Sequence, residues 1–487
     1  MAASTTSKML RSLQICTPIF HYSYRNARFL NLVCGHHGNN LLISRRSYSS
    51  KRNILELHQR GIFHDIYPQT TDELPKKLNS APQTMYCGVD PTAESLHIGN
   101  LLPLMGLLHC QRAGHKCIIV VGGATALVGD PSGKTKEREY VDRETITKNT
   151  DSIKESLHRM ITNHREILCQ GLKELEDIRV LNNFSWYDGT GAIDFLSSIG
   201  RHIRLGDMLS RHSVKSRLNS EEGMSFAEFS YQALQAYDFL YLHHHYDCLV
   251  QIGGNDQIGN MVTGHELVRK ATGKSVYGLT VPLLTSADGN KLGKTAGNAI
   301  WINEDKTSVF DLYQYLVRLP DAVIDRYLRL LTFLPLPEIK EIMRRHEAKP
   351  ANRTAQKKLA EQVLKLVHGD EGLQKALKMS DAIYNSDLEA LGQLSSSEMQ
   401  QLFQGAKINE LILEPGETVF DIAMRVKCLP EGVYGEKIVK EGGFSINQKK
   451  IFNPDQALIR GEHILPNGIT LIRVGKKNYH IIKWIEF

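Results

Sequence analysis

Residues 84–121 read TMYCGVDPTAESLHIGNLLPLMGLLHCQRAGHKCIIVV, and this stretch predicts a strand, a helix and a second strand in succession. Residues 84–90 form a short, largely apolar run. Apolar residues then recur at helical spacing over 95–113, and Gly114 ends the pattern. Residues 116–121 (KCIIVV) show no polar alternation, which is typical of a strand buried on both faces. Such a unit predicts a right-handed crossover within a parallel sheet.

Three further short apolar runs indicate more strands of the same sheet, at residues 178–181, 248–252 and 279–284. Long helical patterns separate them, including 224–246 and 256–272. Five strands interleaved with helices predict an α/β fold, a doubly wound Rossmann-like parallel sheet, over residues 53–305. In such sheets ligands bind at the carboxyl ends of the strands, near the point where the strand order reverses.

In the remainder of the chain the predicted secondary-structure pattern changes twice. Residues 306–410 read as helical packets and predict a small helical domain. Residues 411–487 contain short apolar runs separated by Gly and Asn, and their last two runs, 469–474 and 479–484, predict a hairpin. We therefore expect a small α+β domain at the C-terminus.

Residues 1–52 differ from everything that follows. They contain eight Lys or Arg and no acid, and the first acidic residue is Glu56. A basic, Ser-rich, acid-poor leader is typical of an organellar transit peptide, and the alternative is a basic arm that binds nucleic acid. Without this segment the chain has 51 basic and 53 acidic residues, a net charge of −2. Overall charge therefore gives no argument for nucleic-acid binding.

Composition excludes several classes of protein. The chain has 487 residues, of which 41% are hydrophobic and 23% charged, as in ordinary globular proteins. No run of about 18 apolar residues is present, so no membrane-spanning helix is expected. The eight cysteines form no CxxC pair, and the three adjacent histidines at 243–245 point in different directions on a predicted helix. We expect neither a disulfide framework nor a metal site.

Two loops could bind phosphate groups. His97, Gly99 and Asn100 lie at a predicted helix start, where free N–H groups and the helix dipole attract anions. Residues 291–295 (KLGKT) form a cationic loop that could stabilise a departing polyphosphate. Taken singly, the first motif could be a helix cap and the second a solvated turn. Residues 129–135 (GDPSGKT) look like a P-loop but lack its first glycine at the required spacing.

A third motif is a polar helix face. Tyr231, Gln235 and Asp238 are spaced i, i+4 and i+7, so they share one face of the predicted helix 224–246. Burying such a face without a ligand is unfavourable. This spacing therefore indicates a binding site for a polar small molecule.

Together these motifs resemble the two signatures of the class I aminoacyl-tRNA synthetases. More narrowly, six blocks are similar to the bacterial and mitochondrial type of tyrosyl-tRNA synthetase: 86–93 (YCGVDPTA), 122–125 (GGAT), 129–134 (GDPSGK), 231–238 (YQALQAYD), 251–257 (QIGGNDQ) and 291–295 (KLGKT). The resemblance extends from about residue 54 to the C-terminus. Asn100 and Ile258 depart from the residues that many members carry, and neither departure removes a charge.

The resemblance implies roles for individual residues. The tyrosine-binding residues would be Tyr86, Asp130, Tyr231, Gln235, Asp238 and Gln257. The ATP-binding residues would be Gly88, Asp90, Thr92, His97, Gly99, Asn100, Gly254, Asp256 and Lys294. The catalytic residues would be His97, Asn100, Lys134, Arg138, Lys291, Lys294 and Thr295. The tRNA-binding residues would be Lys449, Lys450, Arg473, Lys476 and Lys477, whose alternative is a solvated basic face.

The resemblance also implies an activity and its partners. Tyrosine would react with ATP, accompanied by Mg²⁺, to give tyrosyl-adenylate and pyrophosphate, and the tyrosyl group would pass to the terminal ribose of tRNA(Tyr). The helical domain would recognise the anticodon, and the C-terminal domain would be an S4-like RNA-binding domain. A homodimer in the mitochondrial matrix, with no membrane association, is expected. The alternatives are a tryptophanyl-tRNA synthetase and an RNA-binding cofactor of group I intron splicing.

Overall fold

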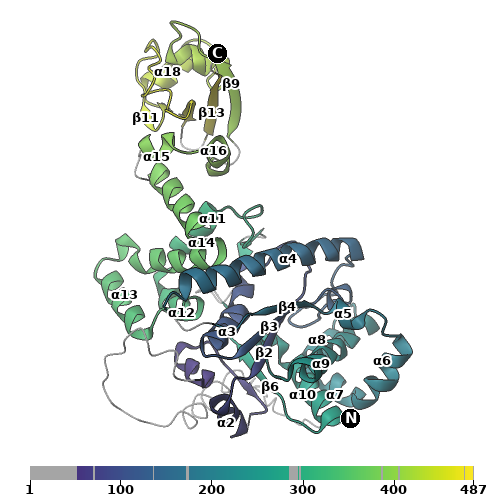
Figure 1. Cartoon of the computed structure of the whole chain (residues 1–487). Helices are drawn as coiled ribbons and strands as arrows, with labels where there is room; N and C mark the ends of the chain where they lie inside the picture. The colour runs from purple at the N-terminus through teal and green to yellow at the C-terminus, as the bar shows by residue number, and fades with distance from the viewer. Residues whose placement is uncertain are drawn as a thin grey trace, which may run out of the picture.

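A computed structural model describes residues 52–69, 72–134, 136–171, 175–284, 294–295, 298–384, 388–403, 406–475 and 478–485. Nearly all of the predicted transit peptide lies outside the described residues. Figure 1 shows a large body built on a central sheet, helices packed beside it, and a small module at the C-terminal end of the chain.

The central sheet has six strands in the order β1-β6-β5-β2-β3-β4. Their bounds are β1 Ile66–Tyr67, β2 Thr84–Val89, β3 Lys116–Val121, β4 Arg179–Asn182, β5 Cys248–Gly254 and β6 Tyr277–Val281. The five predicted strands are all present and parallel to one another. The prediction did not include β1, which pairs antiparallel with β6 and is too short to show any periodicity. From β2 the chain moves toward one edge and from β5 toward the other, so the strand order reverses between them.

Both faces of the sheet are covered, as the unalternated run at 116–121 predicts. On β3, Cys117, Ile119 and Val121 belong to the main hydrophobic core, together with helix α3 (Leu101–Arg112). Ile118 and Val120 belong to a second core on the opposite face, together with α9 (Phe226–Tyr246). Helix α10 (Ile258–Thr272) packs along α9.

The first predicted helix begins later than expected. We predicted a helix over 95–113, whereas a short 3-10 turn, η3 (Ile98–Asn100), precedes α3. His97 has extended backbone angles (φ −105°, ψ 165°). Pro103 has no N–H group, so a helix accepts it only within its first turn, and α3 starts two residues before it.

The other helices of residues 53–305 surround this sheet. Their bounds are η2 Ile54–Arg60, α2 Glu73–Ser80, η4 Thr125–Leu127, α4 Arg143–Asn163, η5 His164–Leu168, α5 Phe184–Tyr187, α6 Ala192–Ser198, η6 Gly200–His202, α7 Leu205–Ser210, α8 His212–Leu218 and η7 Asn255–Gln257. After the sheet, β7 (Lys294–Thr295) and β8 (Asn298–Ala299) form a small ribbon.

Helices account for the region that was predicted to be helical. Their bounds are α11 Val309–Val317, α12 Asp321–Leu331, α13 Leu336–Ala348, η8 Pro350–Asn352, α14 Thr354–Tyr384, α15 Leu388–Gly392 and α16 Ser396–Leu402. No strand occurs among the described residues between 309 and 402. Helix α14 is interrupted at Gly369, whose backbone angles are not helical.

The C-terminal module is a five-stranded sheet in the order β11-β10-β12-β13-β9. The bounds of its elements are β9 Lys407–Ile412, α17 Val419–Arg425, α18 Val433–Lys440, β10 Phe444–Ile446, β11 Lys449–Lys450, β12 Ile469–Val474 and β13 Asn478–Ile485. Strands β12 and β13 form the predicted hairpin. Strand β9 lies parallel to β13 and begins four residues before the predicted domain boundary at 411.

Candidate functional site

A cavity of about 470 Å³ opens at the carboxyl ends of β2 and β5, where the strand order reverses. It is lined by the following residues that the sequence singled out: Tyr86, Gly88, Asp90, Thr92, His97, Gly99, Asn100, Asp130, Lys134, Arg138, Tyr231, Gln235, Asp238, Gly254, Asp256 and Gln257. The structure thus brings together all the tyrosine-binding candidates and nearly all the ATP-binding ones.

Several candidates cannot be assigned to this cavity. Lys291, Lys476 and Lys477 lie outside the described residues. For Lys294 and Thr295 the structure describes the backbone, which forms β7. The basic candidates Lys449, Lys450 and Arg473 belong to the C-terminal sheet.

The floor of the cavity holds a buried acid and a buried phenol. Tyr86 on β2 is 2% exposed and Asp238 on α9 is 5% exposed. The Asp238 carboxylate accepts hydrogen bonds from Trp186 Nε1 (2.8 Å) and Asn183 Nδ2 (3.2 Å). Burial raises the pKa of Asp238 to about 7. The buried Tyr86 hydroxyl has no hydrogen-bond partner within the described part of the chain, so it can bond to a ligand.

A second acid, Asp90, joins two predicted subsites. Its carboxylate accepts hydrogen bonds from the Tyr231 hydroxyl (2.6 Å) and from Thr125 Oγ1 (2.8 Å). Burial raises the pKa of Asp90 to about 6, although the two hydrogen bonds from Tyr231 and Thr125 lower it. The resemblance assigned Asp90 to ATP and Tyr231 to tyrosine, and the bond between them makes the two subsites contiguous.

A glycine makes room for this acid. A β-carbon on Gly122 would lie 2.0 Å from Asp90 Oδ1 and 2.3 Å from Thr125 Oγ1. No side chain fits there unless Asp90 moves. Gly122 is therefore required by the close approach of Asp90, and Gly123 by that of Asn182, whose Oδ1 would lie 2.6 Å from a β-carbon at that position.

Asp130 is the centre of a third group of polar side chains. Its carboxylate accepts hydrogen bonds from Gln257 Nε2 (2.7 Å) and from the Ser132 backbone N–H (3.0 Å). Asn260 Nδ2 lies 3.4 Å from Asp130 Oδ1 and 2.9 Å from Gln235 Oε1. These bonds fix a carboxylate and three amides beside one part of the cavity, an arrangement suited to an ammonium and a carboxylate on the same small molecule.

The sequence analysis missed some residues of the site. Asn260 could have been found, since it follows Gln257 by three residues on a predicted helix and therefore shares its face. Gln251 was also available, because it begins the quoted block 251–257; in the structure it neighbours Tyr86 in the β2–β5 register and lines the cavity. Asn183 and Trp186 carried no signal, since α5 is only four residues long.

The two signature regions are connected by backbone hydrogen bonds. The Ile98 N–H donates to the Ile300 carbonyl (3.0 Å), and the Ile302 N–H donates to the Leu96 carbonyl (2.9 Å). Lys306 also forms an ion pair with Glu94 at 2.5 Å. The segment that follows the Lys-Leu-Gly-Lys-Thr motif is thus held against the segment that leads into His97.

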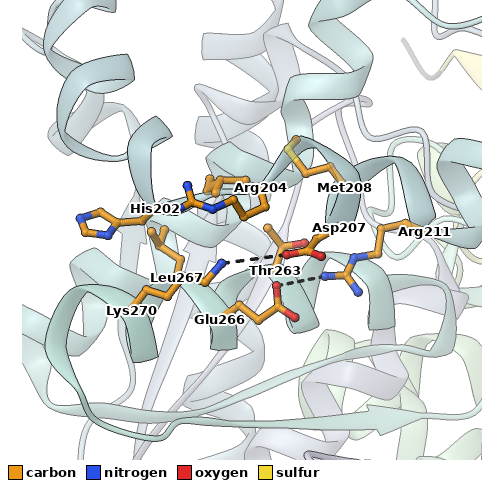
Figure 2. A pocket seen from close by; sticks show the side chains of 10 residues that line it. His202, Arg204, Asp207, Met208, Arg211, Thr263, Glu266, Leu267 and Lys270 are labelled. Atoms are coloured by element: carbon orange, nitrogen blue, oxygen red, sulfur yellow. Dashed lines mark hydrogen bonds and ion pairs between the residues drawn. The ribbon is translucent and has the colours of Figure 1, made fainter.

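A second cavity, between α7 and α10, is much smaller. Its volume is about 10 Å³, close to the space of one water molecule. Arg211 lies 3.4 Å from Glu266, and Lys270 lies 4.0 Å from Asp207. Figure 2 shows these two pairs facing one another across the cavity. The arrangement braces the two helices and leaves no room for a substrate.

Comparison with known proteins places the chain in a family. The model of the tRNA synthetases class I (W and Y) matches residues 78–385, and the chain belongs to this family. Its relatives include the mitochondrial tyrosine–tRNA ligase of Mus musculus, 49% identical over 88% of this chain and 92% of the relative. The tyrosine–tRNA ligase of Geobacillus stearothermophilus is 39% identical over 88% of this chain and 99% of the relative. Within the family, the chain belongs with the tyrosine–tRNA ligases.

The fold is shared with solved structures of the same kind. A C-terminally truncated mitochondrial tyrosyl-tRNA synthetase of Aspergillus nidulans is 33% identical with a TM-score of 0.63, covering 74% of this chain and 99% of that chain. That of Coccidioides posadasii is 36% identical with a TM-score of 0.61, covering 67% and 92%. Among the helices of the described residues, none has the length and apolar character that crossing a membrane requires.

Proposed function

We propose that this chain charges tRNA(Tyr) with tyrosine for translation in the mitochondrion. In the first step tyrosine and ATP give tyrosyl-adenylate and pyrophosphate, and in the second the tyrosyl group passes to the 3′-terminal ribose of the tRNA. The observation that carries the choice of amino acid is the buried Tyr86–Asp238 floor of the cavity. Similarity to tyrosine–tRNA ligases over most of the chain supports the same choice.

The phenol of tyrosine would bind on this floor. Its hydroxyl can bond to the Asp238 carboxylate and to the Tyr86 hydroxyl, which has no hydrogen-bond partner among the residues that the structure describes. Phenylalanine would leave both groups buried without a ligand partner, at a cost of about 1–3 kcal/mol for each unsatisfied group. Discrimination would therefore come from binding alone.

The remaining polar atoms of tyrosine would meet the Asp130 group. In this proposal Asp130, Tyr231 and Gln235 bind the ammonium, and Gln257 lies beside the carboxylate. Gln257 already donates to Asp130 at 2.7 Å, so it can turn an amide hydrogen to a bound carboxylate with little movement. The amino acid would thus be held at both ends, which positions its carboxylate for attack on ATP.

The adenylate step needs positioning and positive charge. A carboxylate is a competent nucleophile at neutral pH, so no general base is required. Asp90, Thr92, Gly254 and Asp256 would bind the nucleoside part of ATP around His97 and Asn100. The cationic residues and Thr295 would stabilise the pyrophosphate as it leaves: Lys134, Arg138, Lys291 and Lys294.

Magnesium would enter with ATP. Among the described residues no group of three or more His, Cys, Asp or Glu could hold a metal ion. The side chains of the cavity instead fit a nucleotide whose phosphates and water molecules carry most of the Mg²⁺ coordination. The ion would neutralise phosphate charge when bound.

A homodimer is part of the proposal. Large apolar side chains are exposed on α6, α7, α8 and the start of α9, and Ile193 and Phe226 are 76% and 78% exposed. Leu196, Leu205 and Leu218 add to this surface. Exposed apolar surface of this extent favours burial against another protein, and a second copy of the chain would supply the same surface.

The tRNA would reach beyond the catalytic region. We propose residues 306–410 as the anticodon-recognition domain and 411–487 as an S4-like RNA-binding domain. Lys450 and Arg473 both lie opposite Ser445 in neighbouring strands, so they share one face of the C-terminal sheet. This shared face supports phosphate contacts by Lys450 and Arg473. Lys449, which pairs with Ile446, lies on the opposite face and would contact phosphate from there. Residues 1–52 would direct the protein to the mitochondrial matrix and be removed.

The test is exchange and charging by protein that lacks residues 1–52. Tyrosine-dependent ATP–pyrophosphate exchange and tyrosylation of organellar tRNA(Tyr) are expected. Exchange that depends on tryptophan and not on tyrosine would reject the proposed substrate. RNA binding without any adenylate formation would reject the enzyme and favour a splicing cofactor.

A further inference from the structure

Helix α14 changes direction at a single glycine. Gly369 has φ 75° and ψ −173°, angles that are essentially restricted to glycine. The break divides the helix into residues 354–368 and 370–384. The angle between the two halves is therefore set at one residue, and whatever holds that residue fixes the direction of the second half.

Helix α4 of the catalytic region holds the break. Arg159 Nε donates to the Val367 carbonyl (3.0 Å), and Asn163 Nδ2 donates to the Leu366 carbonyl (3.1 Å). The last carbonyls of a helix lack intrahelical partners, and a cation beside them is favourable. A β-carbon on Gly369 would lie 3.2 Å from Asn163 Oδ1. Two side chains of α4 thus cap the first half of α14 where it ends.

The other end of α4 is attached to the substrate cavity. Asn149 Nδ2 donates to the Pro91 carbonyl (3.0 Å), in the loop between Asp90 and Thr92. Asn149 and Asn163 are 14 residues apart, about 21 Å along a helix. Helix α4 therefore connects the cavity loop at Pro91 with the break in α14. Figure 1 shows α4 crossing above the sheet toward α14.

The second half of α14 is joined to the C-terminal sheet. Met379 and Ala382 belong to a hydrophobic cluster that includes Leu471 of β12 and Ile481 of β13. The Gln448 side chain donates to the Ala382 carbonyl. Figure 1 shows the C-terminal module at the far end of this helix. A change in the backbone angles of Gly369 would therefore move the C-terminal module relative to the first half of α14.

We propose that Arg159, Asn163 and Gly369 are positioning residues for tRNA charging. They fix the direction of the C-terminal RNA-binding sheet relative to the central sheet, so that a tRNA bound to it is presented to a catalytic cavity of the protein. This inference rests on the proposed function. None of the three touches the cavity, so they act on the tRNA step and leave adenylate formation unchanged.

The test compares Asn163→Ala, Arg159→Met and Gly369→Ala with two matched controls in the full chain. Thr162→Ala is the control for Asn163→Ala, and Arg165→Met is the control for Arg159→Met. Both controls change exposed side chains close to the test residues in the chain. Alanine at 369 favours a continuous helix, because its native angles are strained for any residue with a β-carbon. Small-angle X-ray scattering should show a changed radius of gyration for Gly369→Ala and none for the controls.

The kinetic results expected are specific to the tRNA. Tyrosine-dependent exchange should stay within about two-fold of wild type in every variant. Charging of full-length tRNA(Tyr) should lose about ten-fold or more in kcat/KM, mainly through KM, in the three test variants. An acceptor-stem minihelix, which is too short to span to the C-terminal sheet, should be charged as by wild type.

Two results would overturn the inference. Full-length tRNA charged normally by stably folded Asn163→Ala and Gly369→Ala proteins would show that the junction does not position the sheet. A parallel loss of exchange, minihelix charging and full-length charging would show that these residues only support the catalytic fold. Absence of tyrosine-dependent exchange in the wild type would instead reject the proposed function, which keeps the two failures distinct.

Discussion

The Tyr231 hydroxyl donates a hydrogen bond to the Asp90 carboxylate at 2.6 Å, although the two residues are 141 positions apart in the chain. The bond ties α9, which carries the proposed amino-acid site, to the carboxyl end of β2, which carries the proposed nucleotide site. Each substrate would thus be bound by residues whose orientation depends on the other side of the cavity.

Removal of this bond should shift the acid limb of the pH profile. Asp90 protonates as the pH falls through its pKa of about 6, and the bond from Tyr231 lowers that pKa. In Tyr231→Phe the pKa should therefore rise, and exchange should begin to fall at a higher pH than in wild type. The measurement is kcat/KM for ATP between about pH 5 and 8, values chosen to bracket the transition.

Tyr246→Phe is the matched control for this profile. Tyr246 lies at the end of the same helix α9, does not line the cavity, and its ring packs against Arg179, a contact that phenylalanine keeps. The acid limb should stay where it is in wild type. If the acid limb of Tyr231→Phe lies at the same pH as in wild type, ionisation of Asp90 does not determine the acid limb.

Asp238→Asn should weaken the preference for tyrosine over phenylalanine. The amide oxygen can still accept from Trp186, but the charged acceptor that faces the phenol is lost. We expect the ratio of kcat/KM values for the two amino acids to fall by about ten-fold or more, in line with about 1–3 kcal/mol for a lost buried partner. Exchange measured with each amino acid gives the ratio. An unchanged ratio would remove Asp238 from the recognition of the hydroxyl.

The two buried acids should also make stability depend on pH. The folded-state pKa values of about 7 for Asp238 and 6 for Asp90 are raised above the ordinary aspartate value near 3.9. Between these limits the unfolded state binds fewer protons than the folded state. Their contribution to the free energy of unfolding should therefore decrease as pH rises from about 4 to 7, by at most about 1.4 kcal/mol per pH unit for each group.

Urea unfolding of wild type and Asp238→Asn across this range would measure the effect. The variant lacks one of the two titrating groups, so its stability relative to wild type should improve steadily from about pH 4 to pH 7, the interval defined by the shifts. A difference between the two proteins that is constant with pH would mean that Asp238 ionises normally.

Gly122→Ala should disable the cavity through Asp90. The new β-carbon would overlap Asp90 Oδ1 and Thr125 Oγ1, and both side chains would have to move. We expect a stability loss of about 1–3 kcal/mol and a loss of exchange much larger than that of a glycine-to-alanine change where a β-carbon meets no neighbouring atom. Gly206→Ala is the control, since a β-carbon at this position would have no atom within 4 Å and its φ is not positive.

Much of the fold followed from local patterns, because the relevant signals lie within single elements. The unalternated run at 116–121 predicted β3 with both faces buried, and the spacing of Tyr231, Gln235 and Asp238 predicted a polar helix face that lines the cavity. Strand β1 and the parallel pairing of β9 with β13 were not predicted. Two residues show no periodicity, and a pairing between the two ends of a module leaves no local signal.

The site was predicted as a set of residues and not as a network. Sequence spacing cannot show that Asp90 bonds to Tyr231, or that Asn260 links Asp130 to Gln235, since these contacts depend on how distant elements pack. The 3-10 turn before α3 was missed for a similar reason. The backbone at His97 is extended by its pairing with Trp301, some 200 residues later in the chain.

Strand β13 lies between β12 and β9 inside the C-terminal sheet. During synthesis, β9 leaves the ribosome about 70 residues before its parallel neighbour exists. Nascent chains must therefore hold β9 with an open edge until β13 is made, and a premature stop codon upstream of residue 478 would leave both β9 and β12 without their shared partner. A mutation of that kind would expose two strand edges to aggregation while leaving the catalytic sheet intact.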